Sequence, residues 1–161
     1  MTTMASDRKA ALQIRRVDWT RMLMELKARG GGHRESGAFL LGSRRRRRPK
    51  VTHIVYFDDL EPKSLNGAVH LTTSAYSALW AMCRELGVEV LGDVHTHPGR
   101  MVGQSPIDQD NPLVAQSGHV ALIVPDYAHG RIDLGDVGVY EYRGDDGWAS
   151  RRRGVRHRRW F

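Results

Sequence analysis

A chain of 161 residues with a net charge of +7 has the size of one domain and can bury a core without a second module. Its only cysteine, Cys83, excludes an internal disulfide, and the chain has neither an apolar run of about eighteen residues nor a charged and then apolar leader. We therefore expect a cytoplasmic protein with no membrane span and no secretory signal.

The positive charge is concentrated in two segments. Five arginines run from Arg44 to Arg48, and six more lie between Arg151 and Arg159. Without these eleven, the chain has fourteen basic and eighteen acidic residues, so the body of the domain is mildly acidic. We interpret the first cluster as a solvated hairpin tip, and contact with an acidic protein or a nucleic-acid backbone is the alternative. The tail ends in Trp160-Phe161 and is expected to be disordered.

The chain divides into a short leader, one domain and a basic tail. We expect a flexible leader over residues 1–10, the domain over 11–145 and a flexible tail over 146–161. Asp18 can cap a first helix, and the glycines at 30–32 end it. The apolar face of this helix would be Trp19, Met22, Leu23 and Leu26.

The rest of the domain alternates strands with helices. A second helix begins after Thr73 or Ser74 and ends at Gly87, and it would bury Cys83 on its apolar face. Expected strands cover residues 36–43, 50–57, 68–71, 88–94, 119–124 and 137–143. This mixture of helices and partly antiparallel strands suits an α+β or mixed α/β layer fold.

Two histidines at the end of an expected strand suggest a metal site. Alternate residues of a strand face the same side, so His95 and His97 would present both imidazoles to one point. After seven residues, Ser105-Pro106-Ile107-Asp108 has the pattern of a helix start, which could direct Asp108 back at the histidines. Two imidazoles and one carboxylate leave a fourth position open on tetrahedral zinc, as in catalytic sites.

Each of these pieces has an ordinary structural interpretation when taken alone. A histidine pair at a strand end usually binds no metal, and Ser-x-x-Asp is more often only a helix cap. Glu35 alone would be a surface acid beside a glycine-rich turn. Their conjunction is what indicates a site.

Glu35, His95-Thr96-His97-Pro98 and Ser105-Pro106-Ile107-Asp108 match the JAMM motif of the JAB/MPN metalloprotease family, including the seven-residue gap. The chain resembles prokaryotic members of this family over about residues 10–143. The resemblance implies an MPN-like (cytidine deaminase-like) fold, which is a central mixed β-sheet flanked by helices.

The resemblance also implies a role for each motif residue. His95, His97 and Asp108 would hold one Zn²⁺, which lowers the pKa of a bound water to about 7. Glu35 would act as general base and then general acid without binding the metal. Ser105 would donate a hydrogen bond to the oxyanion, a role that competes with helix capping, and the sequence does not decide between the two.

Members of the family are zinc peptidases or isopeptidases that act at the C-terminal tail of ubiquitin or ubiquitin-like proteins. We expect an active enzyme that matures a ubiquitin-like protein or removes it from targets, in a bacterial conjugation or antiviral defence system whose enzymes could be partners. The substrate tail would add a strand to an exposed sheet edge. Two alternatives stay open: a peptidase that trims a sulfur-carrier protein, and a nucleic-acid-binding module that uses the arginine clusters.

The remaining histidines have no companion at ligand spacing, so we interpret them as structural or surface residues. They are His33, His53, His70, His119, His129 and His157. Asp93 lies on the same strand face as His95, and we keep open that it orients this ligand.

Overall fold

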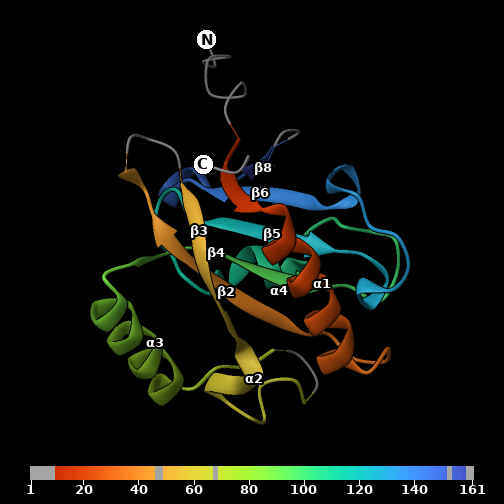
Figure 1. The fold of residues 1–161 in the computed structure, drawn as a ribbon, viewed down its shortest axis with the longest axis horizontal. Coiled ribbons are helices and arrows are strands. Elements are labelled where there is room, and N and C mark those ends of the chain that lie inside the picture. Colours follow the sequence, from red (N-terminus) through yellow and green to blue (C-terminus); the bar gives the residue numbers. More distant parts are fainter. Residues whose placement is uncertain (1–9, 46–48, 67–68, 152–153, 159–161) are drawn as a thin grey trace.

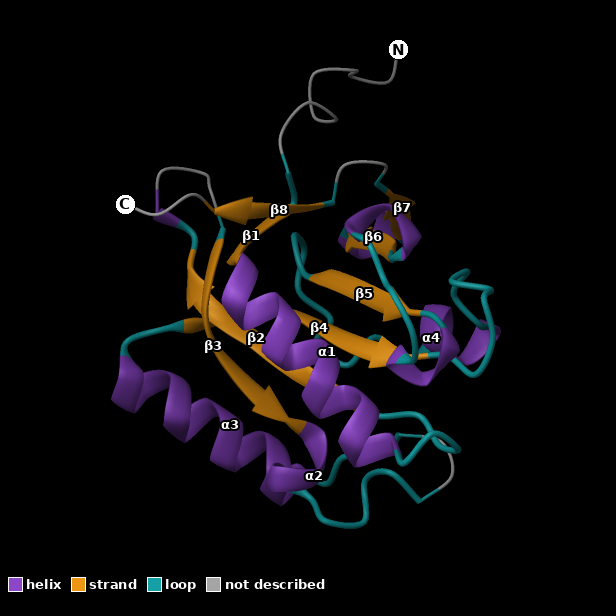
Figure 2. Cartoon of the chain, turned by 45° about the vertical axis from the view of Figure 1, so that its right-hand side comes forward, coloured by secondary structure: helices purple, strands orange, loops and turns teal. Residues whose placement is uncertain are grey.

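The computed structural model describes residues 10–45, 49–66, 69–151 and 154–158. They form a curled mixed sheet with helices on both faces (Figure 1; Figure 2). The sheet contains eight strands in the order β7-β6-β5-β4-β2-β3-β1-β8. The expected mixed α/β class is therefore confirmed.

The strands and helices follow one another closely along the chain. The strands are β1 (Leu12–Arg15), β2 (Gly37–Ser43), β3 (Lys50–Tyr56), β4 (Glu89–Thr96), β5 (Val120–Val124), β6 (Gly138–Tyr142), β7 (Trp148–Ser150) and β8 (Val155–Arg158). The α-helices are α1 (Arg16–Gly30), α2 (Phe57–Leu60), α3 (Thr73–Leu86) and α4 (Pro106–Asp110). Short 3-10 turns cover Asp126–Ala128 (η2), Leu134–Asp136 (η3) and Gly144–Asp146 (η4).

Strand β4 lies in the middle of the sheet, between an antiparallel and a parallel neighbour. It pairs with β2 antiparallel and with β5 parallel. A parallel pair needs a crossover connection, and here the connection contains α4. Because the carboxyl ends of β4 and β5 lie at the same edge of the sheet, the loops that follow them are neighbours.

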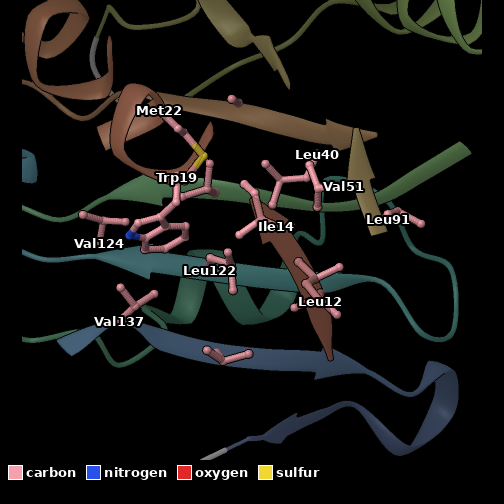
Figure 3. Packing of buried hydrophobic residues seen from close by; sticks show 14 of the residues in the cluster. Leu12, Ile14, Trp19, Met22, Leu40, Val51, Leu91, Leu122, Val124 and Val137 are labelled. Atoms are coloured by element: carbon pink, nitrogen blue, oxygen red, sulfur yellow. The ribbon is translucent and has the colours of Figure 1, made fainter. Parts of the chain in front are cut away.

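One face of the sheet packs against α1. Figure 3 shows Trp19 and Met22 of α1 over the side chains of Leu40 from β2 and of Leu122 and Val124 from β5. Met22 and Leu26 are fully buried, and full burial of such a side chain contributes about 1.5–3 kcal/mol. The predicted apolar face of this helix is therefore confirmed, with Leu23 only partly buried.

The caps of the two long helices differ from expectation at their starts. Asp18 does not cap α1: Arg15 is the N-cap residue without a side-chain bond, and Asp18 instead accepts a hydrogen bond from Arg15 Nε at 2.7 Å. The Thr72 hydroxyl caps α3, one residue before the expected position. Gly31 and Gly87 end the two helices in the left-handed conformation, as predicted.

The other face of the sheet packs against α2 and α3. Its core contains Phe39 and Leu41 of β2, with Leu79 and Cys83 of α3 and Phe57 of α2. Cys83 is buried in this cluster, which confirms its expected core position.

Part of the basic tail belongs to the sheet. The predicted flexible tail over 146–161 is wrong for β7, which pairs with β6, and for β8, which runs parallel to β1. Backbone pairing along β1 requires no apolar side chains, so an arginine-rich composition does not prevent it. Residues 69–71 of the strand expected at 68–71 form no strand. Most of the leader (1–9) and the terminal Trp160-Phe161 lie outside the described residues.

The first residue of the arginine run is a structural contact. Arg44 Nε lies 2.6 Å from Glu89 Oε1, and the guanidinium also donates to the carbonyl oxygens of Val90, Leu91 and Gly118. For Arg44 the interpretation as a solvated hairpin tip is therefore wrong, because its charge ties the end of β2 to β4. Arg46 to Arg48 lie outside the described residues.

No helix in the described part of the chain is long and apolar enough to cross a membrane.

The close approach of β4 to β5 requires glycine at position 92. A Cβ atom there would collide with the carbonyl oxygen of Val120. We expect Gly92→Ala to lower the free energy of unfolding by about 1–3 kcal/mol, because backbone must shift to admit the methyl group. Urea unfolding followed by circular dichroism measures this. At Gly103 an added Cβ meets nothing within 4 Å, so Gly103→Ala is the control. Equal urea midpoints for Gly92→Ala and Gly103→Ala would contradict the prediction.

Candidate metal centre

The pairing of β2 with β4 determines which side chains reach the site. The pairing extends beyond β2, where the Thr96 N–H donates to the carbonyl oxygen of Ser36 at 2.9 Å. Residue 35 therefore lies opposite residue 97. Directly opposed residues of a sheet point to the same face, so Glu35 shares one face with His95 and His97.

Helix α4 brings the carboxylate of Asp108 to the two histidines. Ser105 is the N-cap residue, and its Oγ accepts a hydrogen bond from Asp108 N at 3.1 Å. In return, Asp108 Oδ2 accepts one from Ser105 N at 2.9 Å. This capping box fixes the Asp108 side chain at the start of the helix. The predicted helix start is confirmed, and so is the capping contact of Ser105.

The three predicted ligands form one compact cluster. His95 Nε2 lies 3.2 Å from His97 Nε2 and 3.5 Å from Asp108 Oδ1, and His97 Nε2 lies 3.3 Å from Asp108 Oδ2. Ligands about 2.0–2.1 Å from a tetrahedral zinc ion lie about 3.3 Å from one another. The three separations therefore fit a single small cation, and these side chains form the one group with metal-ligand spacing among the described residues.

The cluster holds protons in the absence of a cation. Burial acts to lower the pKa of His95, but the carboxylates of Asp108 and Asp93 outweigh it and raise that pKa to about 10. Asp108 likewise raises the pKa of His97. Burial acts to raise the pKa of Asp108, yet the two imidazoles hold it well below its usual range. A bound cation would therefore replace protons at this site.

Glu35 and Ser105 line the same cleft as the cluster. The cleft has a volume of about 1040 Å³. Glu35 is half-buried and makes no hydrogen bond or ion pair with the described residues, so its carboxylate is open to the cleft. The Ser105 hydroxyl uses a lone pair for capping, which leaves its O–H free to donate. The two roles considered for Ser105 are therefore compatible.

Two further residues of the cleft were not identified from the sequence. Tyr127 lies in η2, where Asp126, Tyr127 and Ala128 all have positive φ, between 52° and 62°. Strain of this kind in non-glycine residues concentrates at functional sites. Trp148, the first residue of β7, also lines the cleft. No local sequence pattern identifies Tyr127 or Trp148 as a cleft residue, because both are distant in sequence from the predicted ligands and reach the cleft only through the fold.

His119 has a companion that its sequence spacing did not show. Its Nε2 lies 2.6 Å from Asp93 Oδ2, and both side chains are buried. His119 is therefore a buried structural residue, as interpreted, and it lies outside the group with metal-ligand spacing among the described residues. Residues 93 and 119 meet because β4 and β5 are parallel neighbours, which their separation of 26 positions does not reveal.

Comparisons with known proteins give the fold alone. No protein-family model matches the sequence. The fold is similar to the solution structure of a protein from Desulfitobacterium hafniense, with a TM-score of 0.64, 16% identity and coverage of 91% of this chain and 94% of that one. It is also similar to a solution structure from Salinibacter ruber, with a TM-score of 0.59, 17% identity and coverage of 89% and 91%.

The titration of His95 tests the geometry of the cluster. In the metal-free protein we expect its imidazole to be protonated at neutral pH and to lose the proton near pH 10. Because this pKa is above the ordinary 6.5, the resulting stabilisation is fully present below about pH 6.5 and is lost as pH rises through about 10.

Asp108→Asn should bring the His95 pKa down toward 6.5, since a neutral amide no longer favours the imidazolium. Asp110→Asn, an exposed change on the same helix, is the matched control. Nitrogen-15 NMR of the imidazole rings follows each titration. A His95 titration that is the same in the wild type and in Asp108→Asn would contradict the geometry.

Proposed function

We propose that this chain is a zinc peptidase or isopeptidase of the JAB/MPN type with an MPN-like fold. The observation that carries the proposal is the convergence of His95, His97 and Asp108 to separations of 3.2–3.5 Å. A cleft that also contains Glu35 and Ser105 supports it, because hydrolysis needs an acid–base group and an oxyanion donor beside the metal.

The protein residues divide the work of hydrolysis among them. Bound Zn²⁺ would supply a positive charge that lowers the pKa of a water molecule to about 7. The Glu35 carboxylate accepts a proton from the attacking water and then donates it to the leaving amine nitrogen. The water oxygen bonds to the scissile carbonyl carbon, the C–N bond breaks, and the products are an amine and a carboxylic acid, which releases its proton to solvent at neutral pH.

Ser105 would stabilise the negative charge that develops on the scissile carbonyl oxygen. Its hydroxyl is held by the capping box with the O–H still available. A fixed donor of this kind needs no reorganisation during the reaction, which is the basis of oxyanion stabilisation.

The substrate we propose is the C-terminal tail of a ubiquitin-like protein, either as a precursor or joined to a target. Strand β4 has partners on both sides, so a tail cannot pair with it. Strand β7 is at the end of the sheet, and its Trp148 lines the cleft while the indole N–H donates to Gln109 O at 3.2 Å. The edge of β7 therefore offers a tail a route into the cleft. A sulfur-carrier protein is the alternative substrate.

The nucleic-acid alternative receives less support. Arg44 is engaged by Glu89, and the buried Arg151 pairs with Glu141. Both arginines that open the clusters thus have protein partners. Arg45 and Arg156 are exposed and Arg158 is half-buried, and the residues at 46–48, 152–153 and 159 lie outside the described part of the chain.

Glu35→Gln should retain zinc and lose turnover, while Asp108→Ala should lose both. The amide cannot accept the proton of water, so we expect a fall in kcat of about 10²–10⁴-fold. The assay incubates the zinc-loaded protein with a ubiquitin-like protein bearing a C-terminal extension, with and without chelator, and reads the products by mass spectrometry. A sulfur-carrier protein with the same extension is run in parallel.

Elemental analysis of the same preparations gives the zinc content per chain. Near wild-type cleavage by Glu35→Gln would remove Glu35 as the base. A wild-type protein without zinc would remove the whole catalytic proposal.

Ser105→Ala should reduce kcat by about 10²–10³-fold through loss of the oxyanion donor, and should cost about 1 kcal/mol of stability through loss of the cap. Ser105→Thr retains a hydroxyl for both roles and is the matched control. Measurements of kcat and of the thermal unfolding midpoint for both variants separate the loss of the oxyanion donor from the loss of the helix cap. If Ser105→Ala changed only stability, the hydroxyl would be a cap alone.

A further inference from the structure

Behind the metal cluster, a buried carboxylate and a buried imidazole form a pair. Asp93 is 3% exposed and His119 is fully buried. Asp93 Oδ2 accepts a hydrogen bond from His119 Nε2 at 2.6 Å, and Asp93 Oδ1 faces His95 Nδ1 at 3.9 Å. The His95 ring therefore lies between two carboxylates, with Nε2 toward Asp108 and Nδ1 toward Asp93.

The pair does not have the features of a stabilising core contact. Asp93 lies opposite Phe39 on the apolar face that packs against α3, where a hydrophobic side chain would fill the same space. Replacing both members of a buried hydrogen-bonded pair by apolar groups of the same shape can be nearly neutral or stabilising. His119 Nδ1 is also buried without a hydrogen-bond partner among the described residues. An orphaned buried polar atom needs an explanation other than packing.

The second ligand of the cluster shows the same arrangement with a different acceptor. His97 also directs Nε2 to the cluster, and its Nδ1 lies 3.0 Å from the carbonyl oxygen of Met101. An acceptor at Nδ1 places the ring hydrogen there and leaves the Nε2 lone pair for a cation. For His95, the group in the corresponding position is Asp93.

We propose that Asp93 and His119 are positioning residues for the ligand His95. His119 holds Asp93 by one oxygen, so the other oxygen stays turned toward His95 Nδ1. A separation of 3.9 Å is longer than a hydrogen bond, so Asp93 acts through its charge, which favours the tautomer with hydrogen on Nδ1. This inference rests on the proposed zinc site and adds two residues that do not touch the ion.

The test compares zinc affinity among matched variants of the full chain. Asp93→Asn removes the charge but keeps the shape, and His119→Phe removes the donor but keeps a ring. His119→Gln retains an N–H near the position of Nε2. We expect zinc to bind about 10–100-fold more weakly to Asp93→Asn and His119→Phe and with near wild-type affinity to His119→Gln. Competition with a chromophoric chelator gives the dissociation constants of the folded proteins.

A second measurement distinguishes positioning from a structural role. Long-range nitrogen-15 NMR of the zinc-loaded protein reports the His95 Nδ1–H group, whose chemical shift should change and whose hydrogen should exchange faster with solvent in Asp93→Asn, because the facing charge is lost. His53→Gln, which removes an exposed histidine of β3, is the control for both measurements.

The possible outcomes separate this inference from the proposed function. If the wild type binds one zinc ion and Asp93→Asn binds it equally well with an unchanged His95 Nδ1–H signal, the positioning role is wrong while the zinc site stands. If the wild type binds no zinc, both are wrong. If His119→Phe does not fold, Asp93→Asn decides alone, because it leaves no buried charge without a partner.

Discussion

The register between β2 and β4 is the constraint on which the candidate site depends. A slip of one residue would turn Glu35 to the face opposite the histidines. Buried polar bonds oppose such a slip: Ser36 N donates to Thr96 Oγ1 at 2.9 Å, and the Ser36 hydroxyl donates to Leu26 O of α1 at 2.7 Å. Ser36 is fully buried, so another register would leave its polar atoms without partners. The same bonds therefore fix α1, β2 and β4 together.

Helix α4 uses the same atoms for folding and for the site. With five residues it is too short to be stable by its own hydrogen bonds. The capping box with Ser105 contributes local order, and the Asp108 carboxylate that completes it also faces both histidines. A change at either residue therefore alters the helix start and the cluster at once. This shared use explains why the sequence pattern of a helix cap coincides with the pattern of a ligand.

The predictions made from the sequence were right where they depended on a pattern within one strand or one helix start. The period of two in β4 predicted that His95 and His97 share a face, and the Ser105 pattern predicted both α4 and the position of Asp108. The predictions were wrong where the structure depends on pairing between strands that are distant in the sequence. The parallel contact of β8 with β1 joins the two ends of the chain, and the arginine-rich composition concealed it. The bond between Asp93 and His119 needs the parallel pairing of β4 and β5, which no local pattern specifies.

The loop after β5 explains how His97 is held before any ligand arrives. Three consecutive residues at 126–128 have left-handed φ angles, a conformation that costs about 1–2 kcal/mol per non-glycine residue. Two backbone bonds hold this turn against the loop after β4: Tyr127 N donates to His97 O at 2.8 Å and Asp126 N donates to Gly99 O at 2.9 Å. On its other side, His97 N donates to Val124 O at 2.8 Å.

His97 is therefore fixed at both of its backbone polar groups and, through Met101, at its ring. A cation that enters the cluster meets donors that are already ordered. Little of its binding free energy is then spent on ordering the protein, in contrast to metal sites that form only on binding. The strained turn after β5 thus supplies the backbone contacts that order His97 at the end of β4 before a cation binds.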